Sequence, residues 1–444
     1  MKMKKSSVSR VSVVLIFLLC LTGLSGCGGS GGSDIIAVTH PDFELKDGFI
    51  LKVDQQKKAP DGYIAISDGA EFDRIRYNPS ANYILMDDID ISIYTWEPID
   101  DFSGILDGNG YIVSGVAEAL FDEVEGGKIK NLGVQGEVRN SKAAIVEELD
   151  EGSLDNCYFE GSVYNDSTAA ALVGSSYDGY ITNCYNMGDV TGTGCASGIV
   201  AGTFGDYYLI HNCFNAGNIQ NIGIHPGSQS GYSAGILARS ERASGMIRHC
   251  YNVGTISCED FNNYPVYSDY GDAIACGILS YANVPNGESL AIDMCYNGGT
   301  IEGGDLAFGI ALAWGTSASR TQVTNCYNYG EFTHPNSYGI AGCATGTGSR
   351  GDVAIAYCYN ASTTGEAAIS NNSTSLYECY YLDAVPNATA NNAMFANVYA
   401  LNEKEMKKEK NFNFDFDQVW TMGNGEYEYP MFGYKNFEVT DAIA

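Results

Sequence analysis

The chain has 444 residues, and its 54 acidic residues outnumber its 24 basic residues, giving a net charge of −30 at pH 7. Such a charge disfavours binding to nucleic acid or to anionic lipid, because both are themselves negatively charged. Apolar residues make up 45% of the sequence, enough to supply a hydrophobic core. We therefore expect a folded protein with a solvent-exposed acidic surface and no nucleic-acid partner.

The first 26 residues have the pattern of an export signal. A basic start is followed by the apolar run VSVVLIFLLCLTGL, which is too short for a convincing transmembrane helix. The string LSGC at residues 24–27 resembles the lipobox of bacterial lipoproteins, which implies that residues 1–26 are removed and that Cys27 carries a lipid. A plain secretory signal that leaves Cys27 unmodified is the alternative. The rest of residues 27–45 predicts a flexible tether, because it begins rich in Gly and Ser. We thus expect a lipid-anchored protein on a bacterial cell surface.

Residues 46–150 predict an N-terminal cap and the first coils of a repetitive fold. The string YILMDDIDIS alternates apolar and acidic residues, as a strand does, and DGNG at residues 107–110 predicts a turn. Trp96 in this region and Trp420 in the closing segment, residues 386–444, are large apolar side chains near the two ends. We expect both to cap the stack, because repeat proteins need atypical end units.

Residues 151–385 repeat one string. NCYNMGDV begins at Asn183 and NCYNYGEF begins at Asn325, and each copy alternates apolar and polar residues between turn-forming ones, which is typical of strands. A unit of about thirty residues with two or three short strands cannot bury its own apolar face, but stacked copies can. We therefore predict an all-β fold, a right-handed parallel β-helix with atypical capping segments at both ends. The cysteines that recur at one position are Cys157, Cys184, Cys213, Cys250, Cys295, Cys326, Cys358 and Cys379.

Each position of the repeated string has an expected role. The cysteine should point inward, because alternate side chains of a strand face opposite sides. Stacked Cβ atoms lie about 4.8 Å apart, farther than the ~3.8 Å of a disulfide, so free thiols are expected. The second Asn should lie at a corner, where amides hydrogen-bond along the stack. The Gly four residues after Cys should adopt a φ that other residues avoid; these are Gly188, Gly217, Gly254, Gly299 and Gly330.

The repeat resembles that of the GLUG-motif family of bacterial surface and secreted proteins. The segments ANYILMDDIDIS, TWEPIDDFSGILDGNGYIVSGV and LFDEVEGGKIKNLGVQGEV resemble the entry segment of that family, and FDFDQVWTMGNGEYEYPMF resembles its closing segment. The resemblance covers residues 60 to 434, with Ala119 in place of the usual Gly before Leu-Phe. It implies a β-helix displayed at a surface, and it implies no reaction.

Two neighbouring coils carry long insertions at one corner. Eight residues lead from Val190 to the next Gly-Ile, whereas the equivalent counts are sixteen and twenty-one in the next two coils. Insertions on one face of a repeat protein often form its binding face, although neutral drift in loop length is the alternative. The insertions are residues 220–234 and 257–276, and the second is rich in Tyr and Asp. The candidate binding residues are His225, Tyr264, Tyr267, Asp269, Tyr270 and Asp272.

An aromatic residue follows each repeat cysteine and offers a second candidate surface. Such a row, facing out of the coil, could stack against sugar rings, and the alternative is that the rings stack on one another and steady the solenoid. The row consists of Tyr158, Tyr185, Phe214, Tyr251, Tyr296, Tyr327, Tyr359 and Tyr380.

Carboxylates of the N-terminal cap are the candidates for catalysis. Polysaccharide lyases and glycosidases on β-helices use clustered carboxylates, Ca²⁺ or a basic residue. The available acidic cluster is Asp87, Asp88, Asp90, Asp100, Asp101 and Asp107. Of these, Asp88, Asp90 and Asp107 are the candidate catalytic residues, and loop aspartates could bind Ca²⁺. Strand alternation explains the first two without catalysis, and a turn explains Asp107. No histidine pair has the spacing of metal ligands, so we expect no metal site and no cofactor.

These observations favour a monomeric adhesin or ligand-binding scaffold whose partner is a host or environmental glycan or a surface protein. Membrane contact would come through the lipid on Cys27 alone. A polysaccharide-active enzyme and a structural protein of the envelope are the alternatives.

Overall fold

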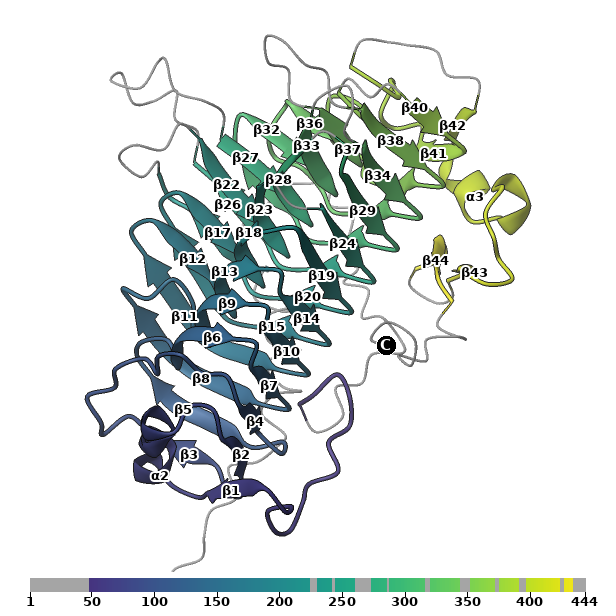
Figure 1. The fold of residues 1–444 in the computed structure, drawn as a ribbon. Helices are drawn as coiled ribbons and strands as arrows, with labels where there is room; N and C mark the ends of the chain where they lie inside the picture. Colours follow the sequence, from purple (N-terminus) through teal and green to yellow (C-terminus); the bar gives the residue numbers. More distant parts are fainter. Residues whose placement is uncertain are drawn as a thin grey trace, which may run out of the picture.

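A computed structural model describes residues 48–223, 230–241, 244–259, 273–285, 287–315, 320–343, 352–371, 375–390, 397–423 and 427–433. The described chain forms a long stack of coils, in which equivalent strands of successive coils lie side by side (Figure 1). Every strand pair within the four large sheets is parallel, for example Tyr180 opposite Leu209 and Val173 opposite Val200. The predicted parallel β-helix is therefore confirmed.

One complete coil contains five short strands rather than the two or three that we predicted, because each coil turns more corners than the sequence pattern indicates. The coil that begins at Tyr180 joins the 12-stranded sheet, crosses the 16-stranded sheet twice, and then joins the 6- and 8-stranded sheets. Its strands are β14 (Tyr180–Thr182), β15 (Tyr185–Asn186), β16 (Asp189–Gly192), β17 (Cys195–Ser197) and β18 (Val200–Phe204).

The sheets run nearly the full length of the stack. The 12-stranded sheet extends from β1 (Tyr63–Ile66) to β40 (Ser375–Tyr377), and the 8-stranded sheet extends from β6 (Phe121–Glu125) to β37 (Ala341–Cys343). The 6-stranded sheet extends from β12 (Thr168–Ala170) to β36 (Ser337–Tyr338). The 16-stranded sheet reaches β42 (Val398–Leu401), so part of the predicted closing segment continues the solenoid.

The repeat cysteines form a column inside the coils. All eight are fully buried in the main hydrophobic core, and all twelve cysteines of the described residues are free thiols, as predicted. The column also makes weak hydrogen bonds, since the backbone N–H of Cys157 donates to the sulfur of Cys184 at 3.4 Å. Burial raises the pKa of both thiols well above the usual value, so they stay protonated.

The second Asn of each string forms the predicted ladder at a corner. The Nδ2 of Asn215 donates to Oδ1 of Asn252 at 2.7 Å and to the carbonyl oxygen of Gly217 in its own coil at 2.8 Å. The same pair of bonds recurs from coil to coil, and every side chain in the ladder is almost completely buried. Its members are Asn186, Asn215, Asn252, Asn297, Asn328 and Asn360.

The Gly four residues after Cys has a different role from the one we predicted. None of these glycines has a φ between +20° and +160°. Instead, a Cβ on Gly254 would lie 2.0 Å from the carbonyl oxygen of Gly217 in the preceding coil. The residue before each Cys is the one with a left-handed backbone, for example Asn183 with φ of 55°. The glycine is thus required by close backbone contact between coils.

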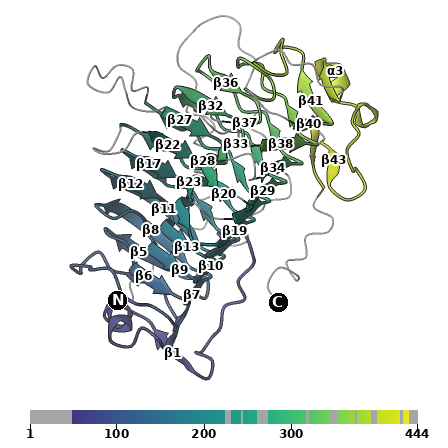
Figure 2. The same ribbon diagram turned by 45° about the horizontal axis from the view of Figure 1, so that its top comes forward.

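The two ends are closed differently. At the N-terminal end, α2 (Gly69–Asp73) covers the first coil, and Phe72 packs against Trp96 with ring centroids 5.5 Å apart. Trp420 instead lies in the hairpin of β43 (Trp420–Met422) and β44 (Pro430–Phe432), which packs on the flank of the stack rather than on its tip. Figure 2 shows α3 (Glu403–Met406) beyond the last coils. No helix among the described residues is long and apolar enough to cross a membrane.

We expect the buried thiols to be unreactive in the folded protein. In the chain from residue 34 onward, which contains twelve cysteines, we expect no reaction with Ellman's reagent under native conditions, because each thiol is buried and out of reach of the reagent. After unfolding in guanidinium, all twelve should react. Rapid reaction of native thiols, or fewer than twelve after unfolding without reductant, would contradict the free, packed column.

The glycine contact predicts a large effect of one methyl group. Gly254→Ala should lower the free energy of unfolding by about 1–3 kcal/mol, because the new Cβ collides with the backbone of the neighbouring coil. Gly223→Ala is the matched control, since nothing lies within 4 Å of its added Cβ, and its effect should stay within about 0.5 kcal/mol. Urea unfolding followed by circular dichroism measures both, and equal effects would refute the contact.

Candidate functional site

The two insertions leave the solenoid at one corner of neighbouring coils. The insertions begin within β21 (Ile219–Asn221) and β26 (Ile256–Cys258), which pair in register, with Asn221 opposite Cys258. They end with β22 (Gly231–Ala234) and β27 (Ala273–Cys276), which also pair in register, with Gly231 opposite Ala273. The corner lies between the 16- and 6-stranded sheets, as the strand assignments show. The predicted common origin of the insertions therefore agrees with the structure.

Hydrogen bonds fix the points where these segments begin and end. The buried Asn221 side chain donates to the carbonyl oxygen of Gly194 at 2.8 Å and accepts from the backbone N–H of Gly223 at 3.0 Å. Near the end of the second insertion, the backbone N–H of Ala273 donates to Oδ2 of Asp305 at 2.8 Å. Both insertions are thus held to the rigid coils above and below them.

Aromatic and cationic side chains lie beside this corner. Tyr232 of β22 packs against Tyr281 of β28 (Leu279–Val284), with ring centroids 4.9 Å apart. The guanidinium of Arg239 lies 6.0 Å from the centroid of the Tyr281 ring and pairs with the carboxylate of Glu241. All four side chains are partly exposed. We call Tyr232, Arg239 and Tyr281 the corner patch; flat rings with an adjacent cation suit contact with a sugar or a protein surface.

Sequence reasoning did not single out the corner patch. Tyr232 lies within the first insertion, but Arg239 and Tyr281 come from strands of two different coils, and only their in-register pairing makes them neighbours. The predicted binding residues lie outside the described residues, as does Cys27. These are His225, Tyr264, Tyr267, Asp269, Tyr270 and Asp272.

The aromatic row is not an open surface for sugar, and this corrects one of our two candidate binding faces. Its rings stack in a column from Tyr158 to Tyr359, with centroids 4.8 Å apart between Tyr185 and Phe214 and an angle of 5° between the planes. None of the eight rings is more than 8% exposed. The alternative prediction, stacking along the solenoid, therefore describes the row.

Both terminal segments of the described chain cover this aromatic column. Phe49 packs on Tyr158 with ring centroids 5.1 Å apart, and the hydroxyl of Tyr185 donates to the carbonyl oxygen of Gly48. From the C-terminal end, Phe432 packs on Tyr327 with ring centroids 5.1 Å apart, and Trp420 also contacts Tyr327. Covering a hydrophobic column that faces away from the main core stabilises it, because its rings would otherwise lie in water.

The three candidate catalytic aspartates make local hydrogen bonds. Asp107 accepts from the side chain of Asn131 at 3.1 Å and forms an ion pair with Lys130 at 2.9 Å. Asp88 accepts from the backbone N–H of Ile112, and Asp90 accepts from that of Ser92 two residues later. Hydrogen bonds from the Ser92 side chain and backbone lower the pKa of Asp90.

Two of these aspartates lie in different sheets. Asp90 lies in β3 (Ile89–Asp90) of the 16-stranded sheet, whereas Asp107 lies in β4 (Ile105–Asp107) of the 12-stranded sheet. Among the described residues, none of the three belongs to a group of acids close enough to share a metal ion. Their catalytic role stays a prediction without a shared site behind it.

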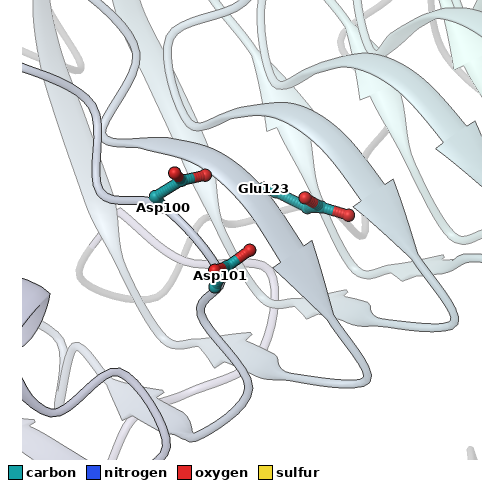
Figure 3. Close-up of side chains that lie close together, drawn as sticks. All are labelled: Asp100, Asp101 and Glu123. Carbon is teal, nitrogen blue, oxygen red and sulfur yellow. The ribbon is translucent and has the colours of Figure 1, made fainter.

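Two other aspartates of the predicted acidic cluster converge with a glutamate that the sequence did not single out. Asp100, Asp101 and Glu123 place one oxygen each within 4.8 Å of the others on the outside of the first coils (Figure 3). Glu123 comes from β6, whose strand pairing with the preceding coil brings it beside the two aspartates. Partial burial, together with repulsion from Glu148 and Asp101, raises the pKa of Glu123. Carboxylates this close could share a Ca²⁺ if water and other oxygens completed its six to eight ligands.

The comparisons with known proteins leave the activity open. No family model matches the chain, and no curated protein matches it. One similar solved structure is a Bacteroides ovatus protein provisionally named as an immunoglobulin A1 protease, with 15% identity, TM-score 0.37, and coverage of 84% of this chain and 92% of that one. Another is an IgA1 protease with 14% identity and TM-score 0.31, matched over 74% of this chain and 22% of its own. Likeness this distant carries no argument about function.

The raised pKa of Glu123 predicts a pH-dependent effect of its removal. Because the folded carboxyl has a pKa above its ordinary value of 4.5, its charge destabilises the fold at neutral pH, and this loss disappears as the pH falls through the folded pKa. Glu123→Gln should therefore raise the Tm at pH 7 and have little effect at pH 4. Glu137→Gln, an exposed change on β8 (Gly133–Arg139) that removes none of the charges raising this pKa, is the control. A Tm that falls at pH 7 would contradict the repulsion.

Proposed function

We propose that this protein is a surface adhesin or ligand-binding scaffold that binds a glycan or a protein at the corner of the two insertions. One observation carries the proposal: β21 pairs with β26 and β22 pairs with β27, so both insertions start and end side by side. The coils beneath hold the ends of both segments in place, and loops fixed on a rigid scaffold commonly carry binding residues.

The chemistry of the corner supports binding rather than catalysis. The corner patch contributes two packed tyrosine rings and a guanidinium, and the second insertion adds several tyrosines and aspartates. Tyrosine contributes contact area while losing little conformational entropy. Placement on a bacterial cell surface through a lipid on Cys27 is part of the same proposal, and the lipobox-like string supports it.

The two other candidate functions have less support. Polysaccharide cleavage needs carboxylates placed on both sides of a glycosidic bond, and the described carboxylates that converge, Asp100, Asp101 and Glu123, gather on one exposed surface. Release of new reducing ends from a polysaccharide would revive that function. A purely structural role in the envelope predicts no soluble ligand at all.

The binding proposal is tested with an array of glycans and matrix proteins. The chain from residue 34 onward should bind at least one class, and binding should be lost when both insertions are shortened to the eight-residue spacing of the neighbouring coil. A second variant, Tyr281→Ala with Arg239→Ala, should weaken the same binding about tenfold or more, because aromatic and Arg contacts dominate binding interfaces.

Controls separate a lost site from a lost fold. Tyr180→Ala removes an exposed tyrosine from β14 in the 12-stranded sheet, away from the corner, and should leave binding unchanged. Circular dichroism should show the same strand content in every variant. Binding that survives trimming would move the site elsewhere on the solenoid, and a complete absence of binding would favour the structural role.

A further inference from the structure

In one column of residues along the solenoid, two central coils carry side chains other than Asn. The residue before each repeat cysteine has a left-handed backbone with φ between 47° and 55°. Asn occupies this position in the coils immediately on either side, where Asn212 donates to Asn183 at 2.7 Å, and Tyr357 and Glu378 occupy it in the last two repeats. Between Asn212 and Asn325, however, the column contains His249 and Met294.

These replacements are costly for the backbone. Asn is among the residues that adopt a left-handed conformation most readily, and His also tolerates it, but Met does so rarely. Met294 nevertheless has φ of 51°. Two successive coils thus give up an amide that hydrogen-bonds along the column in favour of an imidazole and a thioether. Because the last two repeats also lack Asn here, the contacts that the imidazole and the thioether make, rather than the loss of the amide alone, indicate a function.

The two side chains meet, and a second imidazole lies beside them. Nε2 of His249 is 2.8 Å from Sδ of Met294. The ring of His211, at the end of β19 (Tyr207–His211), packs edge-on against that of His249 with centroids 4.9 Å apart. Met294 is only 8% exposed, and both imidazoles are partly buried. Three metal-ligating side chains from three successive coils are therefore gathered at one corner.

We propose that His211, His249 and Met294 form a binding site for a soft monovalent metal ion, Cu(I). A thioether sulfur is a ligand that selects Cu(I), and imidazole also binds copper well, whereas Ca²⁺ and Mg²⁺ prefer oxygen. Donor atoms bound to one ion at about 2.0–2.3 Å lie about 3–4 Å apart. A small rotation of the flexible Met294 side chain opens its contact with His249 to that separation.

Charges around the site are balanced. The guanidinium of Arg248, beside His249 in sequence, pairs with Oδ2 of Asp293 at 3.1 Å. The other carboxylate oxygen of Asp293 accepts from the side chains of Thr324 and Asn325, at 2.8 Å and 2.9 Å. Its oxygens are thus engaged with neighbours rather than offered to the ion, which leaves a nitrogen and sulfur donor set.

The repeat itself supplies the test variants. His249→Asn and Met294→Asn each restore the residue that the column carries in neighbouring coils, so both should keep or raise the Tm. His334→Asn, at a histidine outside the cluster, is the matched control. The purified full chain is first treated with N-ethylmaleimide under native conditions to block any accessible thiol, and is then titrated with Cu(I) against bathocuproine disulfonate in ascorbate.

The expected result is one Cu(I) per chain in the wild type and in His334→Asn, with affinity reduced at least tenfold in His249→Asn and Met294→Asn. X-ray absorption at the copper edge should show nitrogen and sulfur ligands, and the sulfur shell should disappear in Met294→Asn. Unchanged binding in both variants would assign the copper to other groups and overturn the proposal. Absence of Cu(I) binding by the wild type, or a preference for Zn²⁺ over Cu(I), would overturn it equally.

Discussion

The buried amide ladder determines how each coil sits on the next. Each ladder Asn from Asn186 to Asn328 donates both to a carbonyl of its own coil and to the Asn of the coil that follows, as Asn252 does to Gly254 and Asn297. A shift of one residue between coils would break the bond between the two amides inside a dry core, where an unmade hydrogen bond costs about 1–3 kcal/mol. The positions of the cysteine column, the stacked rings and the glycine contacts all follow from this alignment. The ladder ends at Asn360, whose Nδ2 has no partner among the described residues.

Much of this fold could be predicted from repetition alone. The recurring Asn-Cys-Tyr-Asn string indicates coils, an inward thiol and a corner amide, because these roles follow from strand alternation and stacking. The left-handed position was assigned to the wrong residue, since a repeated Gly suggests an unusual φ more readily than close contact does. The Asn before four of the eight repeat cysteines carried the correct signal, because Asn is enriched in that conformation.

The sequence predicts a candidate site only where an unusual spacing between repeat motifs marks it. Counting residues between Val190 and the next Gly-Ile was enough to locate the insertions in neighbouring coils. Contacts across coils were harder: Glu123 lies beside Asp100 only because of strand pairing, and His249 meets Met294 across 45 residues. The cover over the aromatic column was missed for a related reason, since terminal segments outside the repeat have no periodicity that would place them.

The N-terminal segment of the described chain, residues 48–56, which we call the strap, determines where a pulling force acts on the protein. From Gly48 beside Tyr185, the chain passes Asn156 and then Asn109 before it enters the first coil, so it runs along the flank of the stack toward the tip (Figure 1). A force applied to the chain ahead of residue 48 therefore acts partway along the rod. It would break the contacts of Phe49 and Leu51 one after another before any coil bears tension. The strap would thus yield first, and the stacked coils would remain intact under load.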